Sequence, residues 1–563
     1  MQERQNSFFK SWFASGEPWI WVNAAAVGIS ITAVIGILGL IAFKGFAHFW
    51  PTDVSMIEYV TENGQNKKVY GELIELDSLP VQQFIESGGD ARWVKPEQEI
   101  MTRWLVKTGN RRVTPPDFRW LFTDQLKDVS TPKGLMVVER MEWGNAYGAP
   151  TLLKVGGENP RSYTGETLPV RLQESLQRAN IIRDEINSLE RGSMDRINYD
   201  LERLRLERRG IELGGITTSA RLEEITIEEA QLRSLYRTQE AGLRQLYTSL
   251  ERDHLVIVDA EGREIEIHIL DALHVWRPND MSVLDKSLHY IRSIWRFLSE
   301  DPREANTEGG IFPAIFGTIL MVLLMSVMVT PFGVIAALYL REYAKQGPLV
   351  RIIRIAVNNL AGVPSIVYGV FGLGFFVYFL GGNLDRLFFP EALPAPTFGT
   401  PGLVWASLTL ALLTVPVVIV STEEGLTRIP RSLREGSLAL GATKAETLFK
   451  VVLPMASPSI LTGVILAVAR AAGEVAPLML VGVVKLAPTL PLDGNFPFLH
   501  LERKFMHLGF HIYDVGFQSP NVEAARPLVY ATALLLVIII VFLNLTAITL
   551  RSRLEQRYRG VES

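Results

Sequence analysis

Hydrophobic runs long enough to cross a membrane occur six times along the chain. A bilayer core about 30 Å thick needs roughly 20 mainly apolar residues in a helix. The runs are Trp19 to Phe43, Ile311 to Leu340, Ile352 to Leu380, Gly402 to Ser421, Ser459 to Val484 and Pro527 to Leu550. The first run is longer than a secretory signal, and no A-x-A-like cleavage site follows it. We therefore interpret it as a permanent anchor and predict an α-helical integral membrane protein with six transmembrane helices.

Basic residues in the short connecting segments predict which side of the membrane each segment occupies. The basic segments follow the second and sixth runs and precede the first: they contain Arg341, Lys345, Arg351 and Arg354; Arg551, Arg553, Arg557 and Arg559; and Arg4 and Lys10. The segment from Gly381 to Pro401 has one basic residue, Arg386. We therefore predict that both termini are cytoplasmic, as is the loop from Thr422 to Lys450. The segments Lys44 to Gly310 and Lys485 to Arg526 would be external.

A polar insertion separates the first hydrophobic run from the second, and its patterning predicts an external α+β domain. Alternating stretches bounded by Gly and Pro indicate strands: Lys68 to Leu76, Leu135 to Val138, Thr151 to Val155, and a hairpin of Leu255 to Val258 with Glu264 to Ile269. Residues 165–253 are rich in charge and have apolar residues at helical 3,4 spacing, with a break at Gly210 to Ser219. This pattern predicts two helices folded back as an antiparallel coiled-coil hairpin. The hairpin is either a structural spacer or a docking arm for a partner.

Composition excludes several classes of protein. The hydrophobic share of 48% is too high for a wholly soluble chain, and the charged share of 21% is too high for one that lies wholly in a bilayer. The net charge of −4 argues against nucleic-acid binding, which needs clustered Lys and Arg. The chain has no cysteine, so disulfides, thiolate zinc sites and iron–sulfur clusters are excluded. We divide it into an N-terminus and first helix (1–44), an external (periplasmic) domain (45–310) and a membrane core (311–559).

The loop at 422–456 contains a spaced motif. Its residues are Glu435-Gly436-Ser437, then Gly441, then Val451-Val452-Leu453-Pro454. It resembles the EAA loop of ABC-importer permeases, E-A-A-x3-G-x9-I-x-L-P; Glu435, Gly441, Leu453 and Pro454 match that pattern, whereas Gly436, Ser437 and Val451 depart from it. The resemblance implies the fold of an ABC importer type I permease.

Local chemistry suggests how this loop would act. Ser432 to Leu440 would form a helix, Gly441 would allow a turn, and Lys444 to Val452 would form a second segment that Pro454 terminates before the fifth run. Such a helix–turn–helix is a rigid knob for a soluble partner. The side chains expected at its rim are Arg428, Arg431, Arg434 and Glu435. The alternative is an ordinary charged loop with snorkelling arginines.

The chain contains no G-x-x-x-x-G-K-[ST] phosphate-binding loop. It is therefore not expected to be an enzyme, and ATP hydrolysis would belong to a separate subunit. No cofactor is expected in this chain, since ATP and Mg would bind to that partner.

Two further stretches narrow the resemblance. Ala469 to Leu478 and Asn359 to Gly369 resemble PstA-type permeases of the high-affinity phosphate importer, and the likeness covers Ile311 to Arg559. The insertion resembles the enlarged N-terminal region of long PstA-type proteins. The resemblance implies a phosphate permease of the cell inner membrane. Its expected partners are a PstC-type permease, a PstB-type ATPase dimer and a PstS-type periplasmic phosphate-binding protein.

Two charged residues, Arg470 and Glu474, lie near the middle of the predicted fifth span and on one helix face. A charge at a helix centre costs about 2.5–3.5 kcal/mol, so such groups usually face a pathway or the bundle interior. A guanidinium offers a planar fork of donors matched to phosphate oxygens. The pair is therefore a candidate substrate pathway, and in the family resemblance these positions are implicated in phosphate passage. The alternative is a structural ion pair that locks the helices.

Other polar residues are weaker candidates. Asn358, Asn359, Ser365 and Tyr368 would more often bond across helices. His507 and His511 have the spacing of metal ligands but no evident third ligand, so we interpret them as ordinary loop histidines.

Two alternative functions stay open at this point. The chain could be a permease for another oxyanion, such as sulfate or molybdate. It could also be a membrane-anchored receptor or scaffold that acts through the coiled-coil arm.

Overall fold

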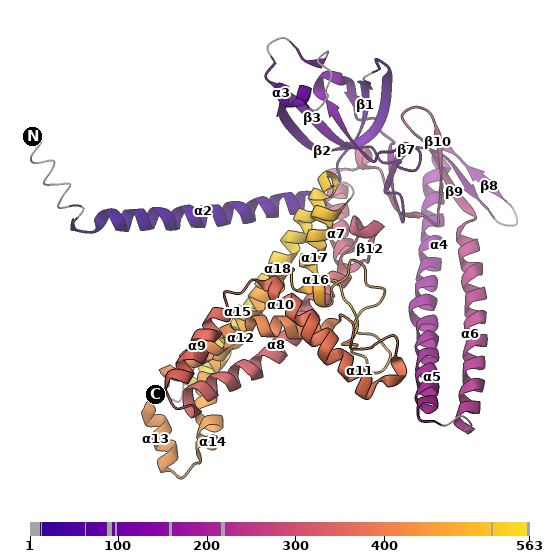
Figure 1. The fold of residues 1–563 in the computed structure, drawn as a ribbon. Helices are drawn as coiled ribbons and strands as arrows, with labels where there is room; N and C mark the ends of the chain where they lie inside the picture. Colours follow the sequence, from indigo (N-terminus) through magenta and orange to yellow (C-terminus); the bar gives the residue numbers. More distant parts are fainter. Residues whose placement is uncertain are drawn as a thin grey trace, which may run out of the picture.

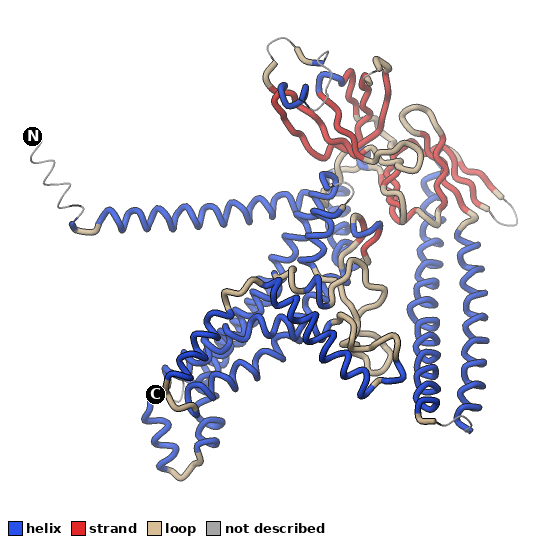
Figure 2. The backbone as a smooth tube through the Cα atoms, in the orientation of Figure 1, coloured by secondary structure: helices blue, strands red, loops and turns tan. Residues whose placement is uncertain are grey.

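The computed structural model describes residues 12 and 14–559, apart from 62, 87–92, 96–97, 157–159, 216–219 and 520–521. Among these residues, six helices are long and apolar enough to cross a membrane, as predicted. The basic N-terminus with Arg4 and Lys10 lies outside the described residues. Most of the apolar helices form one tilted bundle, the first of them extends away from it, and the strands lie in the insertion at one end of the bundle (Figures 1 and 2).

The centre of the bundle is α12 (Leu403–Arg428), which packs against α8 (Phe312–Leu338) and α15 (Leu453–Gly473). Close approach depends on small residues. A Cβ on Gly463 of α15 would lie 2.8 Å from the Cβ of Ser421 on α12. Two further apolar helices lie on the outside: α18 (Val522–Arg559) packs on α15, and α2 (Glu17–Ala47) contacts α18. Most apolar side chains of α2 are exposed, as expected for a helix that faces lipid or a partner.

The third span differs from its prediction. The predicted continuous helix from Ile352 to Leu380 is broken by Ala361–Pro364. The pieces are α9 (Pro348–Leu360), α10 (Ser365–Phe371), the π-helical turn η8 (Gly372–Gly381) and α11 (Gly382–Phe388). The break has a local cause, because Pro364 lacks an N–H and disfavours helical geometry in the residue before it. The candidate membrane span runs from Ser365 to Phe388.

The fifth span also differs from its prediction, Ser459 to Val484. Its apolar helix covers Lys444–Gly473, because α14 (Lys444–Thr447) and a π-helical turn (Leu448–Val452) continue into α15 without a stop. The expectation that Pro454 terminates the preceding segment is wrong. Pro454 occupies the first turn of α15, and a proline is tolerated there after a π-helical turn. After Gly473 the chain bends and forms only the short α16 (Leu478–Val481).

The insertion is an α+β unit, as predicted, with one pair of short antiparallel strands and two larger antiparallel sheets. Their strand orders are β4-β3-β2-β1-β5 and β10-β9-β7-β6-β11, with β8 on β7. The strands are β1 (Val54–Val60), β2 (Asn66–Pro80), β3 (Ile100–Lys107), β4 (Phe118–Phe122), β5 (Leu126–Ser130), β6 (Met136–Arg140), β7 (Asn145–Val155), β8 (Arg161–Tyr163), β9 (Asp253–Val258), β10 (Glu264–His268) and β11 (Ala272–Trp276). The predicted hairpin is β9–β10. The insertion also contains α3 (Val81–Glu86) and α7 (Val283–Ser299), and β12 (Pro302–Arg303) and β13 (Glu308–Gly309) lead into α8.

The predicted helical hairpin is present. Its first side is α4 (Leu168–Ser188), a π-helical turn (Leu189–Met194) and α5 (Asp195–Leu213), and its second side is α6 (Ala220–Leu250). The two sides lie side by side in Figure 1. The break predicted at Gly210 to Ser219 starts later, because α5 includes Gly210; residues 216–219 lie outside the described residues. Supercoiling of the two sides stays a prediction.

Candidate substrate pathway and coupling hairpin

Two interruptions of helical backbone meet inside the bundle. Gly369 of α10 lies against the chain that follows α15, so that a Cβ added to it would be 2.7 Å from the Cα of Pro477. Tyr368 packs in the same core cluster as Ala471 and Leu478. The Tyr368 hydroxyl donates to the Leu360 carbonyl at 2.7 Å and so satisfies one of the backbone groups that the first break exposes. Tyr368 thus joins α10 to α9 across the break, a bond between helices of the kind expected for these polar residues.

Arg470 and Glu474 lie at the second interruption. The sequence predicted mid-helix positions, but Arg470 is in the last turn of α15 and Glu474 caps its end. Arg470 Nε is 3.6 Å from Glu474 Oε1, and the side chains are 32% and 21% exposed. The predicted ion pair is thus present and is partly open to its surroundings. A cation at a helix C-terminus also interacts favourably with the backbone dipole.

Broken helices at membrane depth are informative about function. In lipid, free N–H and C=O groups cost several kcal/mol each, so irregular backbone is tolerated only inside protein or along a water-filled cavity. Transporters place binding sites at such interruptions. Here the breaks at Ala361–Pro364 and Glu474–Pro477 adjoin one core cluster, and the second carries the charged pair.

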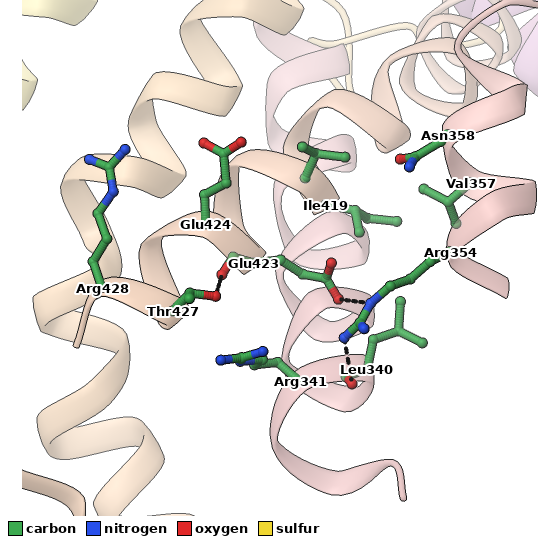
Figure 3. Close-up of a pocket in the computed structure, with 11 residues that line it drawn as sticks. Leu340, Arg341, Arg354, Val357, Asn358, Ile419, Glu423, Glu424, Thr427 and Arg428 are labelled. Atoms are coloured by element: carbon green, nitrogen blue, oxygen red, sulfur yellow. Dashed lines mark hydrogen bonds and ion pairs between the residues drawn. The ribbon is translucent and has the colours of Figure 1, made fainter. Parts of the chain in front are cut away.

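A cleft of about 500 Å³ lies between α9, α12 and the π-helical turn η7 (Tyr339–Tyr343) that follows α8 (Figure 3). Arg354 Nε is 3.3 Å from Glu423 Oε1, and Arg354 also donates to the Leu340 carbonyl. Arg341 and Arg428 line the cleft and make no ion pair among the described residues. Figure 3 shows that these side chains come from different helices.

This cleft was not predicted from the sequence. Arg341 and Arg354 were interpreted only as markers of membrane sidedness, and their convergence depends on the break in the third span. Asn358, a weak sequence candidate, lies on the cleft wall at the end of α9. Asn359 is exposed, and Ser365 begins α10 on the far side of the break.

The predicted helix–turn–helix is present at the end of the bundle opposite the insertion (Figure 1). Helix α13 (Arg431–Ala439) ends before Gly441, whose φ of +89° is the left-handed conformation that glycine adopts without strain. Thr443 and Glu446 form a reciprocal capping box at the start of α14. The hydroxyls of Ser437 and Thr447 lie 2.9 Å apart and join the two helices. We refer to residues 431–452 as the coupling hairpin.

The coupling hairpin strongly exposes two large apolar side chains, one beside its turn and one in its second segment. Leu440 is 90% exposed and Phe449 is 69% exposed. Arg431 and Glu435 are also exposed, in agreement with the expected polar rim. Such exposed apolar groups ringed by charge are typical of a surface that enters a groove on a partner.

Arg434 differs from its expected place on the rim. Its guanidinium donates to the Leu426 carbonyl at 2.7 Å and to the Ile429 carbonyl at 2.9 Å, and it forms an ion pair with Glu342 at 3.0 Å. Arg434 thereby ties the hairpin to the ends of α12 and α8. The physical reason is that α12 ends at Arg428 with free carbonyls, which a nearby guanidinium can satisfy.

His507 and His511 are not surface loop residues. His511 lies in α17 (Leu508–Tyr513), and His507 caps that helix by accepting from the Gly509 N–H at 3.1 Å. Both are buried, and burial lowers the pKa of His507 to about 3 and that of His511 to about 4. Within the described ranges, no group of three or more His, Cys, Asp or Glu is placed to hold a metal ion.

Comparison with known proteins places this architecture in a class. Residues 329–560 match the family model of the binding-protein-dependent transport system inner membrane component. The chain is thus a multi-pass inner-membrane permease of that transport class, and such permeases are not enzymes themselves.

Individual relatives identify the family. The phosphate transport system permease protein PstA of Mycobacterium leprae is 36% identical over 254 residues, which are 45% of this chain and 74% of that protein. The probable PstA of Methanocaldococcus jannaschii is 32% identical, over 41% of this chain and 73% of that protein. This chain belongs to the PstA family of phosphate transport system permeases. Among solved structures, an inward-facing MetNI methionine ABC transporter is 19% identical, with a TM-score of 0.32, and the match covers 43% of this chain and 94% of that chain.

Proposed function

We propose that this chain is the permease subunit of an ATP-driven importer that carries inorganic phosphate across the inner membrane. Membership of the PstA family supports the substrate class. The observation that carries the mechanism is the Arg470–Glu474 pair at the meeting point of two helix breaks. A partly exposed guanidinium at that depth is a suitable transient ligand for a phosphate anion.

The proposed topology follows from the distribution of basic residues. The coupling hairpin and the cleft of Arg341, Arg354 and Arg428 lie at the cytoplasmic end of the bundle. The insertion lies in the periplasm, and both termini lie in the cytoplasm. The separation of the insertion from the hairpin at opposite ends of the bundle supports this arrangement.

Transport proceeds by alternating access in this proposal. A PstB-type ATPase dimer binds ATP with Mg and closes. Its closure moves the coupling hairpin through the exposed side chains of Leu440 and Phe449. Arg431, Glu435, Gly441, Leu453 and Pro454 form or support the contact, and Arg434 passes the motion to α8 and α12 through its bonds to Glu342 and Leu426. The spans then rock against those of a PstC-type permease, and phosphate delivered by a PstS-type protein moves inward.

Glu474 gives the pathway a release step. A guanidinium without an ion-pair partner would hold a dianion tightly. When a carboxylate is nearby, it pairs with the guanidinium again as the anion leaves, and this pairing favours release. Phosphate thus competes with Glu474 for Arg470, and the competition keeps binding weak enough for passage.

The decisive experiment has two readouts on one preparation. After gentle detergent extraction, an ATPase dimer and a second permease are expected to co-purify with this chain. In proteoliposomes, ATP-driven uptake of labelled phosphate is expected to resist competition by sulfate and molybdate. Preferred uptake of sulfate would assign the chain to another oxyanion, and a preparation without an ATPase would contradict the importer assignment.

The helical arm provides the test of the receptor or scaffold alternative. Deletion of residues 165–253, with a short Gly-Ser linker in their place, is expected to leave ATP-driven uptake measurable. Loss of a phosphate-dependent cellular signal with intact uptake would instead favour a receptor role for the arm.

A further inference from the structure

Helix α7 connects the sheets of the insertion to the second span and has two unlike faces. It begins at a capping box, in which Ser282 Oγ accepts from the Asp285 N–H and the Asp285 carboxylate accepts from the Ser282 N–H. It has 17 residues, about 25 Å, which is less than the ~30 Å of a bilayer core, and it carries four charged residues, Asp285, Lys286, Arg292 and Arg296. The arrangement of its side chains indicates a different relation to the membrane.

One face of α7 is apolar and uncovered. Leu284, Leu288, Ile291 and Trp295 recur at spacings of four, three and four, so they form a single stripe. Their side chains are 70%, 54%, 64% and 68% exposed. Arg292 is exposed at the edge of this stripe and makes no ion pair among the described residues.

The other face of α7 is fixed to the protein. Arg296 Nη1 is 3.3 Å from Glu139 Oε2 on β6, and Lys286 forms an ion pair of 2.6 Å with Asp53. Phe297 is buried and packs against Phe49, which follows the first span, with the two ring centroids 5.1 Å apart. These contacts set the rotation of the helix, so the apolar stripe cannot turn inward.

The height of α7 is set by two membrane helices. Trp50, three residues after the end of α2, packs on Tyr290 of α7 with ring centroids 5.9 Å apart. Near the C-terminal end of α7, the Ile311 N–H donates to the Phe297 carbonyl at 2.8 Å, and α8 begins at the residue after Ile311. The helix therefore lies where the first span ends and the second begins.

We propose that α7 lies in the plane of the outer headgroup layer, with its apolar stripe inserted into lipid. Its features are those of an interfacial helix: an apolar face with Trp, a fixed polar face and a basic residue at the rim. Tyr290 and Trp50 lie at the same level, as in an aromatic belt. Arg292 reaches the lipid phosphates by snorkelling.

Lipid explains the stripe better than a protein partner does. The chain that leaves α2 and the chain that enters α8 both contact α7, and α2 and α8 themselves carry exposed apolar side chains of the kind that face a bilayer. An interfacial position also gives the external domain a fixed orientation toward the membrane, since β6 is ion-paired to α7.

The chain suits site-directed spin labelling because it contains no cysteine, so an introduced cysteine is the single labelling site in this chain. Intrinsic fluorescence would not be specific, because the chain has 11 tryptophans. Leu288→Cys and Ile291→Cys, each with a nitroxide label, are measured in the full complex in bilayers of phosphatidylethanolamine and phosphatidylglycerol. The matched control is Ile227→Cys on α6, where the parent side chain is 59% exposed. Frequent collision of the label with oxygen, which partitions into lipid, indicates that the label lies in lipid. Frequent collision with a water-soluble nickel chelate indicates that the label lies in water.

The ratio of oxygen to nickel collisions is expected to be several-fold higher at positions 288 and 291 than at position 227. Equal ratios at all three positions would overturn the proposal, because the stripe would then face water. Low collision with both reagents at 288 and 291 would also overturn it, in favour of a covering protein such as the second permease. A thermal unfolding midpoint in detergent equal to that of the parent protein confirms that each labelled variant folds before reconstitution.

Discussion

The Arg470–Glu474 pair gives the sharpest test of the proposed pathway. At the observed Nε to Oε1 distance of 3.6 Å and an effective dielectric constant of about 20, Coulomb's law gives roughly 5 kcal/mol for two unit charges. The side chains are 32% and 21% exposed, so solvent and salt screen the attraction to about 2–3 kcal/mol. A phosphate oxygen at the same distance from Arg470 gains a similar amount. Loss of this cation is therefore expected to weaken phosphate binding at this position by about 30- to 140-fold.

The perturbation is Arg470→Gln, which keeps hydrogen-bonding capacity and removes the charge. We expect ATP-driven uptake of labelled phosphate in proteoliposomes to fall by about 30- to 140-fold at low phosphate. Arg470→Lys keeps the charge but loses the fork, so it is expected to retain intermediate uptake. Undiminished uptake by Arg470→Gln, at equal amounts of reconstituted protein, would refute the pathway role.

A charge swap separates a pathway role from a structural one. In Arg470→Glu/Glu474→Arg the ion pair is kept and the cation moves by four residues. A pair that only locks the helices predicts recovery of uptake in the double variant. The pathway role predicts that thermal stability recovers and uptake does not, because the cation no longer lies at the same position in the break.

Three further predictions concern the coupling hairpin and the buried histidines. Arg434→Met leaves Glu342 unpaired and is expected to cost about 3 kcal/mol, seen as a lower thermal midpoint of the purified complex. Leu440→Asp changes a 90% exposed side chain, so it is expected to leave the midpoint unchanged while reducing phosphate transported per ATP hydrolysed. His507 and His511 are held neutral, with pKa values of about 3 and about 4, so the thermal midpoint is expected to fall as the pH drops from about 6.5 toward 4.

Each of these has its own control. For Arg434, the exposed neighbour Arg431→Met is expected to keep the midpoint, and equal midpoints for both variants would contradict the anchoring role. For Leu440, the matched change is Ile227→Asp on the arm; an equal loss of coupling there would show a general effect. The histidine argument follows from the sign of the shift, since below pH 6.5 the unfolded chain takes up protons that the folded chain cannot bind. A midpoint that is flat between pH 6.5 and 4, or His511→Leu with the wild-type slope, would contradict it.

Apolar length and periodicity predicted the elements that carry a continuous apolar run or a regular apolar stripe. The first, second, fourth and sixth spans, the β9–β10 hairpin and the helical hairpin of α4 to α6 follow from apolar length or spacing alone. The turn at Gly441 was predicted because its left-handed φ of +89° strongly favours glycine. Such features are written in local sequence.

The helix breaks and the cleft could not be predicted from the local sequence. An apolar run does not show where a helix bends, so Pro364 was absorbed into a predicted third span and Pro454 was taken as a stop. Proline acts differently after a π-helical turn, and that turn depends on packing. The convergence of Arg354 with Glu423, 69 residues away, and the anchoring of Arg434 on Glu342 are tertiary contacts that spacing cannot reveal.

The helical arm is held at its root in the sheets, at the ion pair of Arg191 with Asp301 between α4 and α5, and again partway along α5. Its root lies in the sheets through β7 and β9, and partway along α5 the Tyr199 hydroxyl donates to the Phe496 carbonyl while Asn495 Nδ2 lies 3.3 Å from Asp195 Oδ2. From Leu168 to Tyr199 the helices extend about 47 Å at 1.5 Å per residue. A member clamped at both ends of such a length behaves as a strut. If the sheets tilt over the membrane, this strut must bend or detach. The loop before the sixth span is therefore mechanically coupled to the orientation of a domain that lies hundreds of residues earlier in the chain.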